Sequence, residues 1–434
     1  MYRRYYFLII NLFILNHCFS QIDSFNLRDF VLPEVKIKSL TIDGDAAGNT
    51  KSVQQTNNQQ QSNFRARINL RYRNFYNSPE LQKEQYSGLL SQYNILNHST
   101  SNPNAQYTNF YSSNTLFINT NDRFYFKPKK FWGLGGAFFT TYSHNKSTSS
   151  TDPGIAHESK IATVSISPKI QIGFGRIETV TSAWKTLRIL KDFEAFGLLS
   201  HSPSNEEILQ LAQTIAQQEY NRVFDSRLGT IRRIEAIDRQ IQNSHLINSA
   251  ESTYFTLLYD SYLYGIQTSR KAGNRLTFEI QPNVELRLKP AQLTTNLSSS
   301  IAYESFNPVN QYWQIDFALQ LITKTSEINT ASRSFNLGVK TYLSTAYYPN
   351  SRTSFSANIA FNKAITGGFS DIFPLHPFSL GTKINYYLSP RTRLTAYFSV
   401  NKFTGYLLAT TAFPDQTNSH DELKYGLMLK HAIF

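Results

Sequence analysis

Four arginines alternate with apolar residues in the stretch RARINLRYR, and they are the groups of this chain best suited to holding a charged ligand. One parity of the stretch carries Arg65, Arg67, Arg71 and Arg73. The other parity is apolar from Phe64 onward. A period of two predicts a β-strand with one charged face and one apolar face. Because guanidinium groups cannot stay unpaired in a dry core, the charged face must meet water, anions or carboxylates.

The same alternation recurs in later segments and adds further charged residues to the predicted inner face. These inward-facing residues are Lys169, Glu279, Glu285, Arg287 and Lys340, with Arg275, Asp316, Lys383 and Arg393 as further candidates. Basic groups outnumber acids in this set, so we expect a lumen that binds or conducts anions. The alternative is that the arginines pair with lumen acids, such as Glu279, Glu285 and Asp316, and brace a plugged barrel.

The sequence contains no recognisable motif for catalysis or cofactor binding. The nine histidines form no HExxH, and neither a GxSxG elbow nor a Walker lysine occurs. The stretch GFGRIE at residues 173–178 has no third glycine at the dinucleotide-binding spacing, so a glycine-dependent turn after a strand is the better interpretation. We predict that the chain is not an enzyme and that it uses no cofactor and no metal.

Residues 1–20 predict export of the chain. Two arginines precede an apolar run, and small residues end the segment at Ser20, which is the pattern of a signal peptide. An uncleaved anchor helix is the alternative. Cys18 is the only cysteine, so cleavage after Ser20 leaves a mature chain without thiol chemistry. Residues 21–63 are expected to form a periplasmic leader, disordered in its Gln- and Asn-rich part at 49–63.

Long amphipathic segments fill most of the remaining chain, and no later apolar run is long enough to predict a transmembrane helix. Segments of about ten residues or more can cross a bilayer as tilted strands. The predicted strands are 64–76, 106–126, 131–147, 158–176, 272–289, 293–304, 311–324, 331–348, 352–364, 376–389, 391–404 and 421–434. The predicted fold is therefore an all-β transmembrane barrel of about twelve antiparallel strands in the bacterial outer membrane. A soluble secreted β protein is the alternative fold.

The connections between these strands alternate in length, as the periplasmic turns and outer loops of such barrels do. Short turns are expected at 127–130, 307–310, 348–352 and 389–392, and longer loops at 77–104, 148–157, 365–375 and 405–420. The hairpin at 289–293 breaks the rule by having a short outer turn. The large interruption at 177–271 separates strands 1–4, at 64–176, from strands 5–12, at 272–434. It follows a downward strand, which places it in the periplasm.

The interruption has the sequence pattern of helices. Ser204 or Asn205 can cap a helix whose buried face is Ile208, Leu211, Ala212 and Ile215. A further helix carries Leu228, Ile231, Ile234, Ile237 and Ile241. Residues 252–266 are compatible with a helix or with an added strand. We therefore predict an α-helical periplasmic insertion that gates or plugs the mouth of the barrel.

Aromatic residues near the strand ends complete the membrane pattern. Trp132, Tyr142, Trp313, Tyr347 and Tyr386 are expected on the lipid side as interface anchors. The chain ends in Phe434 after an alternating segment, which resembles the C-terminal strand read by the barrel assembly machinery, although Phe434 lies on the parity opposite the apolar row. We therefore expect outer-membrane lipid and the barrel assembly machinery as partners.

Four stretches, GFGRIETVTSAWKTLRIL, FDSRLGTIRRIEAID, STYFTLLYDSYLYG and RKAGNRLTFEIQP, together resemble an uncharacterised family of outer-membrane proteins from Bacteroidetes-type bacteria. The resemblance covers roughly residues 170–285. It implies an outer-membrane barrel with a helical periplasmic insertion, and it brings no known activity. The polar residues that it singles out are Arg176, Glu178, Asp225 and Arg227, with an expected role in docking the helices under the barrel. A surface that binds a periplasmic partner is the alternative role.

Two functions remain open from the sequence. The first is a porin-like channel or solute-binding barrel with a basic lumen. The second is a non-conducting structural barrel whose helical insertion docks a periplasmic or secretion partner. The formal net charge of +13 would also suit nucleic acid. However, the chain has no basic recognition helix, zinc-ligand spacing or RNA-binding motif, so we exclude nucleic acid as a partner.

Overall fold

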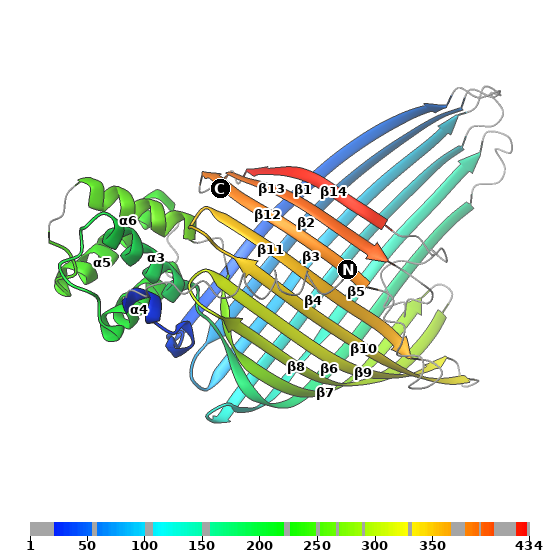
Figure 1. Ribbon diagram of the computed structural model, residues 1–434. Helices are drawn as coiled ribbons and strands as arrows, with labels where there is room; N and C mark the ends of the chain where they lie inside the picture. Colours follow the sequence, from blue (N-terminus) through cyan, green and yellow to red (C-terminus); the bar gives the residue numbers. More distant parts are fainter. Residues whose placement is uncertain are drawn as a thin grey trace, which may run out of the picture.

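The computed structural model describes residues 21–53, 59–99, 107–149, 157–220, 226–248, 252–265, 269–288, 291–328, 332–365, 378–389, 392–402 and 422–431. Every strand within these ranges belongs to one antiparallel sheet, in which each strand pairs with its neighbours in sequence. The helices α3 to α6 gather beyond one end of the strands (Figure 1). We call this the helical end of the sheet and the opposite end the loop end. The fold is thus an antiparallel β-barrel with a helical insertion.

The described sheet has fourteen strands rather than the twelve predicted. They are β1 (Val35–Val53), β2 (Gln59–Asn77), β3 (Leu81–Ser99), β4 (Tyr107–Lys127), β5 (Lys130–Ser149), β6 (His157–Thr179), β7 (Lys271–Leu288), β8 (Ala291–Pro308), β9 (Trp313–Ile328), β10 (Ser332–Tyr347), β11 (Thr353–Ile365), β12 (Phe378–Ser389), β13 (Thr392–Lys402) and β14 (Glu422–His431). Strands β1 to β6 are about twice as long as β13 and β14, so one side of the wall extends further at the loop end (Figure 1).

Two sequence predictions are wrong at this point. Residues 21–63 are not only a leader, since β1 pairs along its whole length with β2, from Val35 opposite Asn77 to Val53 opposite Gln59. The expected long loop at 77–104 contains β3, which pairs with β2 and β4. Because two strands are added before the insertion, the strand count stays even. The insertion therefore still follows a strand that runs toward the helical end.

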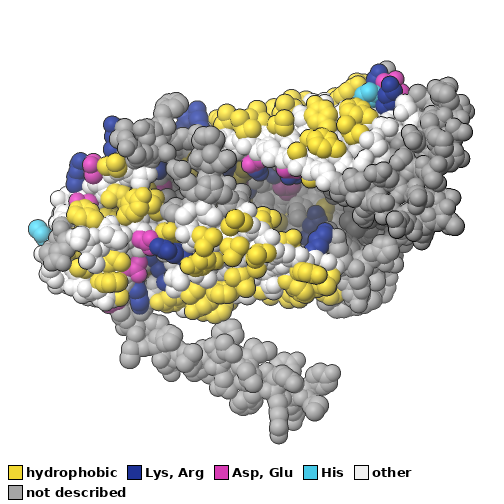
Figure 2. Space-filling view, turned by 90° about the horizontal axis from the view of Figure 1, so that it is seen from above, with side chains coloured by type: hydrophobic (Ala, Val, Ile, Leu, Met, Phe, Trp, Pro, Cys, Tyr) yellow, Lys and Arg dark blue, Asp and Glu magenta, His cyan; other side chains and the backbone are white. Residues whose placement is uncertain are grey.

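The two faces of the sheet differ in chemistry. Along β7 the exposed side chains include Ile280, Val284, Leu286 and Leu288, and these alternate with more buried polar ones. The register continues this apolar row onto neighbouring strands, for example through Ile172 opposite Phe278 and Ile301 opposite Phe278. Figure 2 shows hydrophobic side chains over the outside of the wall and charged side chains in the hollow between its sides. We call these faces the outer row and the inner row.

Aromatic side chains occupy the outer row near the helical end. Trp132 stacks on Phe124 with ring centroids 4.5 Å apart. Trp313 lies 4.6 Å from Tyr347, which in turn lies 6.3 Å from Phe355. These contacts make a row of rings across β9, β10 and β11. The other two expected anchors, Tyr142 and Tyr386, are also exposed on the outer row.

The helical insertion consists of α3 (Thr181–Ala195), α4 (Asn205–Tyr220), α5 (Ser226–Asn243) and α6 (Ser252–Gly265). The ambiguous segment at 252–266 is thus a helix. The predicted cap is confirmed, because the Ser204 amide donates to the Glu207 carboxylate at 2.7 Å and the Glu207 amide donates to the Ser204 hydroxyl at 3.3 Å. This reciprocal pair is a capping box that satisfies two free amides at the start of α4.

The hydrophobic core of the molecule lies in this insertion. The predicted face of α4, which is Ile208, Leu211, Ala212 and Ile215, is fully buried. The centre of the core is α3, whose residues from Thr181 to Leu190 are all buried. The N-terminal segment completes the core, because α2 (Gln21–Ser24), η1 (Leu27–Asp29) and the residues up to Val35 contribute buried apolar side chains. We call α3 to α6 together with residues 21–34 the helical unit.

No helix among the described residues is both long enough and apolar enough to cross a bilayer.

Candidate functional site

The arginines of β2 lie on the inner row beside carboxylates of β1. Arg67 contacts Asp45 at 2.6 Å, and Arg71 forms an ion pair with Asp43. All four side chains remain about half exposed, with 45% of Arg67 and 54% of Arg71 accessible to solvent. The alternative in which the arginines pair with lumen acids thus holds for these two arginines, but β1 supplies the acids rather than Glu279, Glu285 or Asp316. Ion pairs this exposed contribute about 0–1 kcal/mol and weaken in salt.

Two of the three acids predicted as partners have other contacts. Lys169 on β6 lies 3.4 Å from Glu279 on β7, so two predicted inward residues pair with each other. Asp316 accepts a hydrogen bond from the side-chain amide of Gln314 at 2.7 Å. Glu285 lies on the inner row between Ser165 and Thr294, and no described residue pairs with its carboxylate.

Several inner-row cations have no ion pair among the described residues. Arg65, Arg287 and Lys340 lie on this row by register, and no described carboxylate contacts them. Arg73 stacks instead on the ring of Tyr86, at 5.4 Å from the centroid. The inner row therefore keeps an excess of positive charge after its ion pairs are counted.

The inner-row residues whose side chains the structure describes show the same imbalance as a whole. Its described basic residues are Arg65, Arg67, Arg71, Arg73, Arg123, Lys169, Lys271, Arg275, Arg287, Lys324, Lys340, Lys383, Arg393 and Lys424. Its described acids are Asp43, Asp45, Glu84, Glu279, Glu285, Glu304 and Asp316. A low-dielectric wall that carries such a row concentrates small anions in the water that it encloses.

Exposure along the inner row falls from the loop end to the helical end. The side chains of Arg67 and Arg71 are about half exposed. Closer to the helical end, Gln171 is 2% exposed, Arg123 is 7% and Thr277 is 7%. The inner row thus surrounds water in its loop-end half and is packed in its helical-end half. We call the two halves the vestibule and the floor.

The floor is built by the end of β6, which reaches across to the hairpin of β2 and β3. Arg176 donates to the carbonyl of Pro79 at 2.7 Å, to that of Ser78 at 2.7 Å and to the Asn77 side chain at 3.1 Å. It also pairs with Glu178 and lies 4.6 Å from the centroid of the Tyr125 ring. We call these contacts of Arg176 the latch.

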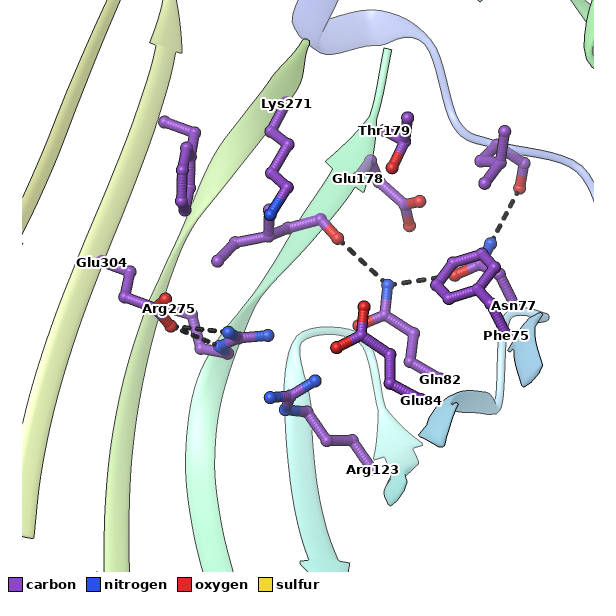
Figure 3. Close-up of a pocket in the computed structure, with 13 residues that line it drawn as sticks. Phe75, Asn77, Gln82, Glu84, Arg123, Glu178, Thr179, Lys271, Arg275 and Glu304 are labelled. Carbon is purple, nitrogen blue, oxygen red and sulfur yellow. Dashed lines mark hydrogen bonds and ion pairs between the residues drawn. The ribbon is translucent and has the colours of Figure 1, made fainter. Parts of the chain in front are cut away.

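A second contact joins β6 to the hairpin of β2 and β3. Gln82 of β3 donates its side-chain amide to the carbonyl of Ile177 at 3.1 Å, as Figure 3 shows, and it accepts from the Tyr125 hydroxyl at 3.0 Å. Since β4 and β5 lie between β3 and β6 in the sheet, the bond from Gln82 to Ile177 spans the lumen, whereas the bond with Tyr125 joins the neighbouring strands β3 and β4. The N-terminal segment covers the junction, where Asn77 donates to the carbonyl of Leu32 at 3.3 Å.

Gly175, the second glycine of the GFGRIE stretch, permits a bend near the end of β6. Gly175 has φ +96°, and a Cβ there would lie 2.0 Å from the carbonyl oxygen of Asn274. Only glycine adopts this conformation without strain. The unusual dihedral expected of a glycine here is therefore confirmed, but the turn into the helix lies beyond the stretch, because β6 continues to Thr179 and α3 begins at Thr181.

The turn between β8 and β9, on which α3 docks, is held by Arg270, which precedes β7 and is 1% exposed. Its guanidinium donates to the carbonyls of Gln311 at 2.8 Å, Asn310 at 2.9 Å and Trp313 at 2.8 Å. Burial lowers the pKa of Arg270 to about 10, so it keeps its charge at neutral pH. Carbonyl dipoles rather than a carboxylate therefore balance this buried cation.

Helix α3 makes further contacts with the same turns. The indole of Trp184 donates to the carbonyl of Gln311 at 2.7 Å. Arg188 donates to the carbonyl of Pro349 at 3.1 Å, and its guanidinium lies 4.5 Å from the centroid of the Tyr312 ring. The turns between β8 and β9 and between β10 and β11 are thus bound to a single face of α3.

A partly buried carboxyl in α3 makes the stability of the helical unit depend on pH. Burial raises the pKa of Asp192, and a hydrogen bond from Ser261 offsets part of this rise. Because its folded-state pKa exceeds the unfolded value of about 3.9, its contribution is most favourable below that value and is lost as the pH rises through the raised pKa. Asp192→Asn should therefore gain thermal stability relative to the parent between about pH 4 and neutral pH. Melting curves followed by circular dichroism test this, and a difference that stays constant with pH would contradict it.

The remaining predicted docking residues are only partly described. Asp225 lies outside the described residues, as does Phe434, and Arg227 lies in the first turn of α5 without a described side chain. Of the four, Arg176 and Glu178 come together, and they join β6 to β2 rather than dock a helix. Sequence reasoning did not single out Arg270, Trp184 and Arg188, because single residues that contact turns far away in the chain give no periodic pattern. In the described part of the chain, no group of His, Cys, Asp and Glu could hold a metal ion.

The sequence matches no protein-family model and no curated protein. Among solved structures, the TodX deltaS2S3 mutant monoaromatic hydrocarbon channel is similar, with a TM-score of 0.35, 7% identity and coverage of 86% of both chains. The translocator domain of the autotransporter NalP from Neisseria meningitidis has a TM-score of 0.26 at 8% identity, covering 77% of this chain and 85% of its own. OmpT, an outer membrane protein of Vibrio cholerae, has a TM-score of 0.21 at 8% identity, covering 78% of this chain and 90% of its own. At these TM-scores the likeness carries no argument about function.

Proposed function

We propose that the chain is a bacterial outer-membrane β-barrel that collects small anionic solutes in its vestibule and passes them only when its floor opens. The single observation that carries this proposal is the fall in exposure along a basic inner row, from half-exposed arginines to a packed floor. A vestibule that is wet at one end and closed at the other suits capture followed by controlled passage rather than free diffusion.

Membrane insertion is supported by the outer row. Its exposed residues are mainly large apolar ones, and a continuous exposed apolar surface of this size is unstable in water. The row of aromatic rings at the helical end has the chemistry of a membrane–water interface. Both β1 and β14 have their free ends at the helical end, which is the arrangement of a barrel whose termini lie in the periplasm. The helical unit is then periplasmic, and the vestibule opens to the outside.

Anion capture is tested with two fluorescent reporters of the same size, one sulfonated and one carrying an amine, added to purified protein in detergent. The sulfonated reporter should bind, and its affinity should fall with added salt because the vestibule cations are exposed. Arg65→Glu combined with Arg287→Glu should weaken this binding at least tenfold. Lys160→Glu is the matched control, since Lys160 lies on the outer row and pairs with Glu158. Equal binding of both reporters would contradict the proposal.

A partner-docking function is the second candidate, and a specific surface favours it. Phe255 and Tyr259 lie one turn apart on α6, and 43% and 53% of their surfaces are exposed. Exposed aromatic pairs of this kind are common at protein interfaces. A photoreactive residue at position 259 should crosslink to one defined periplasmic protein if the helical unit docks a partner. Unchanged mobility of the irradiated protein on gels would count against this function.

A further inference from the structure

A small cavity lies inside the floor, between the latch and the ends of β7 and β8. Its volume is about 70 Å³, and its walls come from β2, β3, β4, β6, β7, β8 and the N-terminal segment. Six ionisable side chains line it, namely Glu84, Glu178, Glu304, Arg123, Lys271 and Arg275. Figure 3 shows Arg123, Glu84, Lys271 and Arg275 pointing toward a common space. The cavity therefore differs from the vestibule, because acids and bases are equal in number.

Arg123 is the unusual member of this group. It is 7% exposed, its Nε has no hydrogen-bond partner, and no described carboxylate forms an ion pair with it. A buried guanidinium is costly unless a carboxylate or several acceptors satisfy it. The nearby carboxylate of Glu304 is bound by Arg275, which donates to one of its oxygens through two hydrogen bonds of 2.6 Å and 3.0 Å. Arg123 thus presents free donors to the cavity.

Glu84 presents the opposite charge to the same space. It lies on β3, two residues beyond Gln82, which pairs with Arg123 of β4, and it has no hydrogen bond or ion pair among the described residues. The two groups share a cavity wall without pairing. A further cation, Lys271, extends into the cavity with its ammonium group 5.0 Å from the centroid of the Phe306 ring. One free guanidinium and one free carboxylate side by side match a ligand that carries both charges.

We propose that this cavity binds a small zwitterion that carries a carboxylate and an ammonium group a few bonds apart, as an α-amino acid does. The ligand carboxylate accepts from Arg123, and its ammonium group donates to Glu84. The rings of Phe75 and Phe306 line the cavity and leave room only for a small apolar substituent. This inference rests on the proposed function, since a ligand reaches the cavity through the vestibule. A plain anion fits less well, because Glu84 would repel it.

L-Alanine is the probe, and propionate and ethylamine are matched compounds that lack its ammonium group and its carboxylate. Calorimetric titration of the purified full-length protein should show L-alanine binding at least tenfold more tightly than either compound. Equal binding of propionate would reveal an ordinary anion site and overturn the inference. No binding of L-alanine at millimolar concentrations would also overturn it, since the charges of Arg123 and Glu84 would then be solvated by water alone.

Variants assign the binding to the two residues. Arg123→Met and Glu84→Gln should each weaken L-alanine binding at least tenfold, and Glu84→Gln should not weaken propionate binding. Lys340→Met, on the inner row away from the cavity, should bind L-alanine as the parent does. Folding of each variant is checked by heat-modifiable mobility on gels. If Arg123→Met does not fold, the titrations of the parent with L-alanine, propionate and ethylamine decide whether the cavity binds a zwitterion. L-Alanine binding without capture of the sulfonated reporter would leave the site standing and reject the proposed function.

Discussion

Replacing Arg270 by methionine is expected to weaken the docking of the helical unit, because Arg270 holds the turn between β8 and β9 that Trp184 of α3 binds. Three backbone carbonyls, on Asn310, Gln311 and Trp313, lose a buried donor in this variant. Only the Asn310 carbonyl then lacks a donor among the described residues, because Trp184 still donates to Gln311 and the Val309 amide still donates to Trp313. An unsatisfied buried carbonyl costs about 1–3 kcal/mol, so docking should weaken by about that amount. Hydrogen exchange of the α3 amides measures this directly. The exchange rate should rise about tenfold or more if exchange proceeds through undocking.

The matched control is Arg352→Met at the same interface. Arg352 pairs with Asp260 of α6, but both side chains are more than one third exposed. Such a pair contributes about 0–1 kcal/mol, so exchange in α3 should change little. Arg270→Lys should be intermediate, because it keeps the charge and loses the branched set of donors. Similar exchange in the Arg270→Met and Arg352→Met proteins would show that Arg270 does not fix the helical unit.

Replacing Arg176 by methionine is expected to open the floor. This change removes the bonds to Ser78, Pro79 and Asn77 that hold the end of β6 across the lumen. Liposomes that contain the parent protein should swell slowly in solutions of small solutes, because the floor is packed. Liposomes with the Arg176→Met protein should swell several-fold faster. The rate of swelling, followed by light scattering, is the measurement.

Lys169→Met provides the control on the same strand. Its only ion pair in the described part of the chain is with Glu279, and it takes no part in the latch. Lys169→Met removes one positive charge from β6, as Arg176→Met does. It therefore separates the effect of losing the latch on swelling from the effect of losing a charge. Fast swelling with the parent protein would contradict a closed floor. An Arg176→Met protein that swells as slowly as the parent would show that other contacts keep the floor closed.

The strands that sequence reasoning found are those with large apolar residues on a single parity. β7 and β9 are examples, because Ile280 to Leu288 and Trp313 to Leu321 keep this alternation without a break. β3 was missed because Lys83, Gln85 and Ser87 occupy its outer parity near the helical end. β1 was missed for a related reason, since glycines replace large residues on its outer parity after Ile42. Both strands are specified by pairing with β2, which no local pattern reveals.

The candidate site was predictable only as a charge pattern. Alternation placed the arginines of β2 on one face, but their carboxylate partners lie on β1, a strand that the sequence pattern did not indicate. The floor depends on contacts between residues about a hundred positions apart, such as Gln82 with Ile177. Such contacts follow from the curvature of the sheet and from the bend at Gly175. Neither property can be read from hydrophobic periodicity alone.

The central claim is that the inner row is open at the loop end and closed at the helical end, and cysteine labelling along β7 tests it most directly. Cys18 is the only natural cysteine, so single cysteines at Arg287 in the vestibule and at Thr277 in the floor can be compared after its removal. A cysteine at Ile280, on the outer row, serves as the lipid-facing control. A bulky, membrane-impermeant maleimide added to intact cells should label position 287 and leave positions 277 and 280 unlabelled. Labelling of both 287 and 277, or of neither, would contradict the claim.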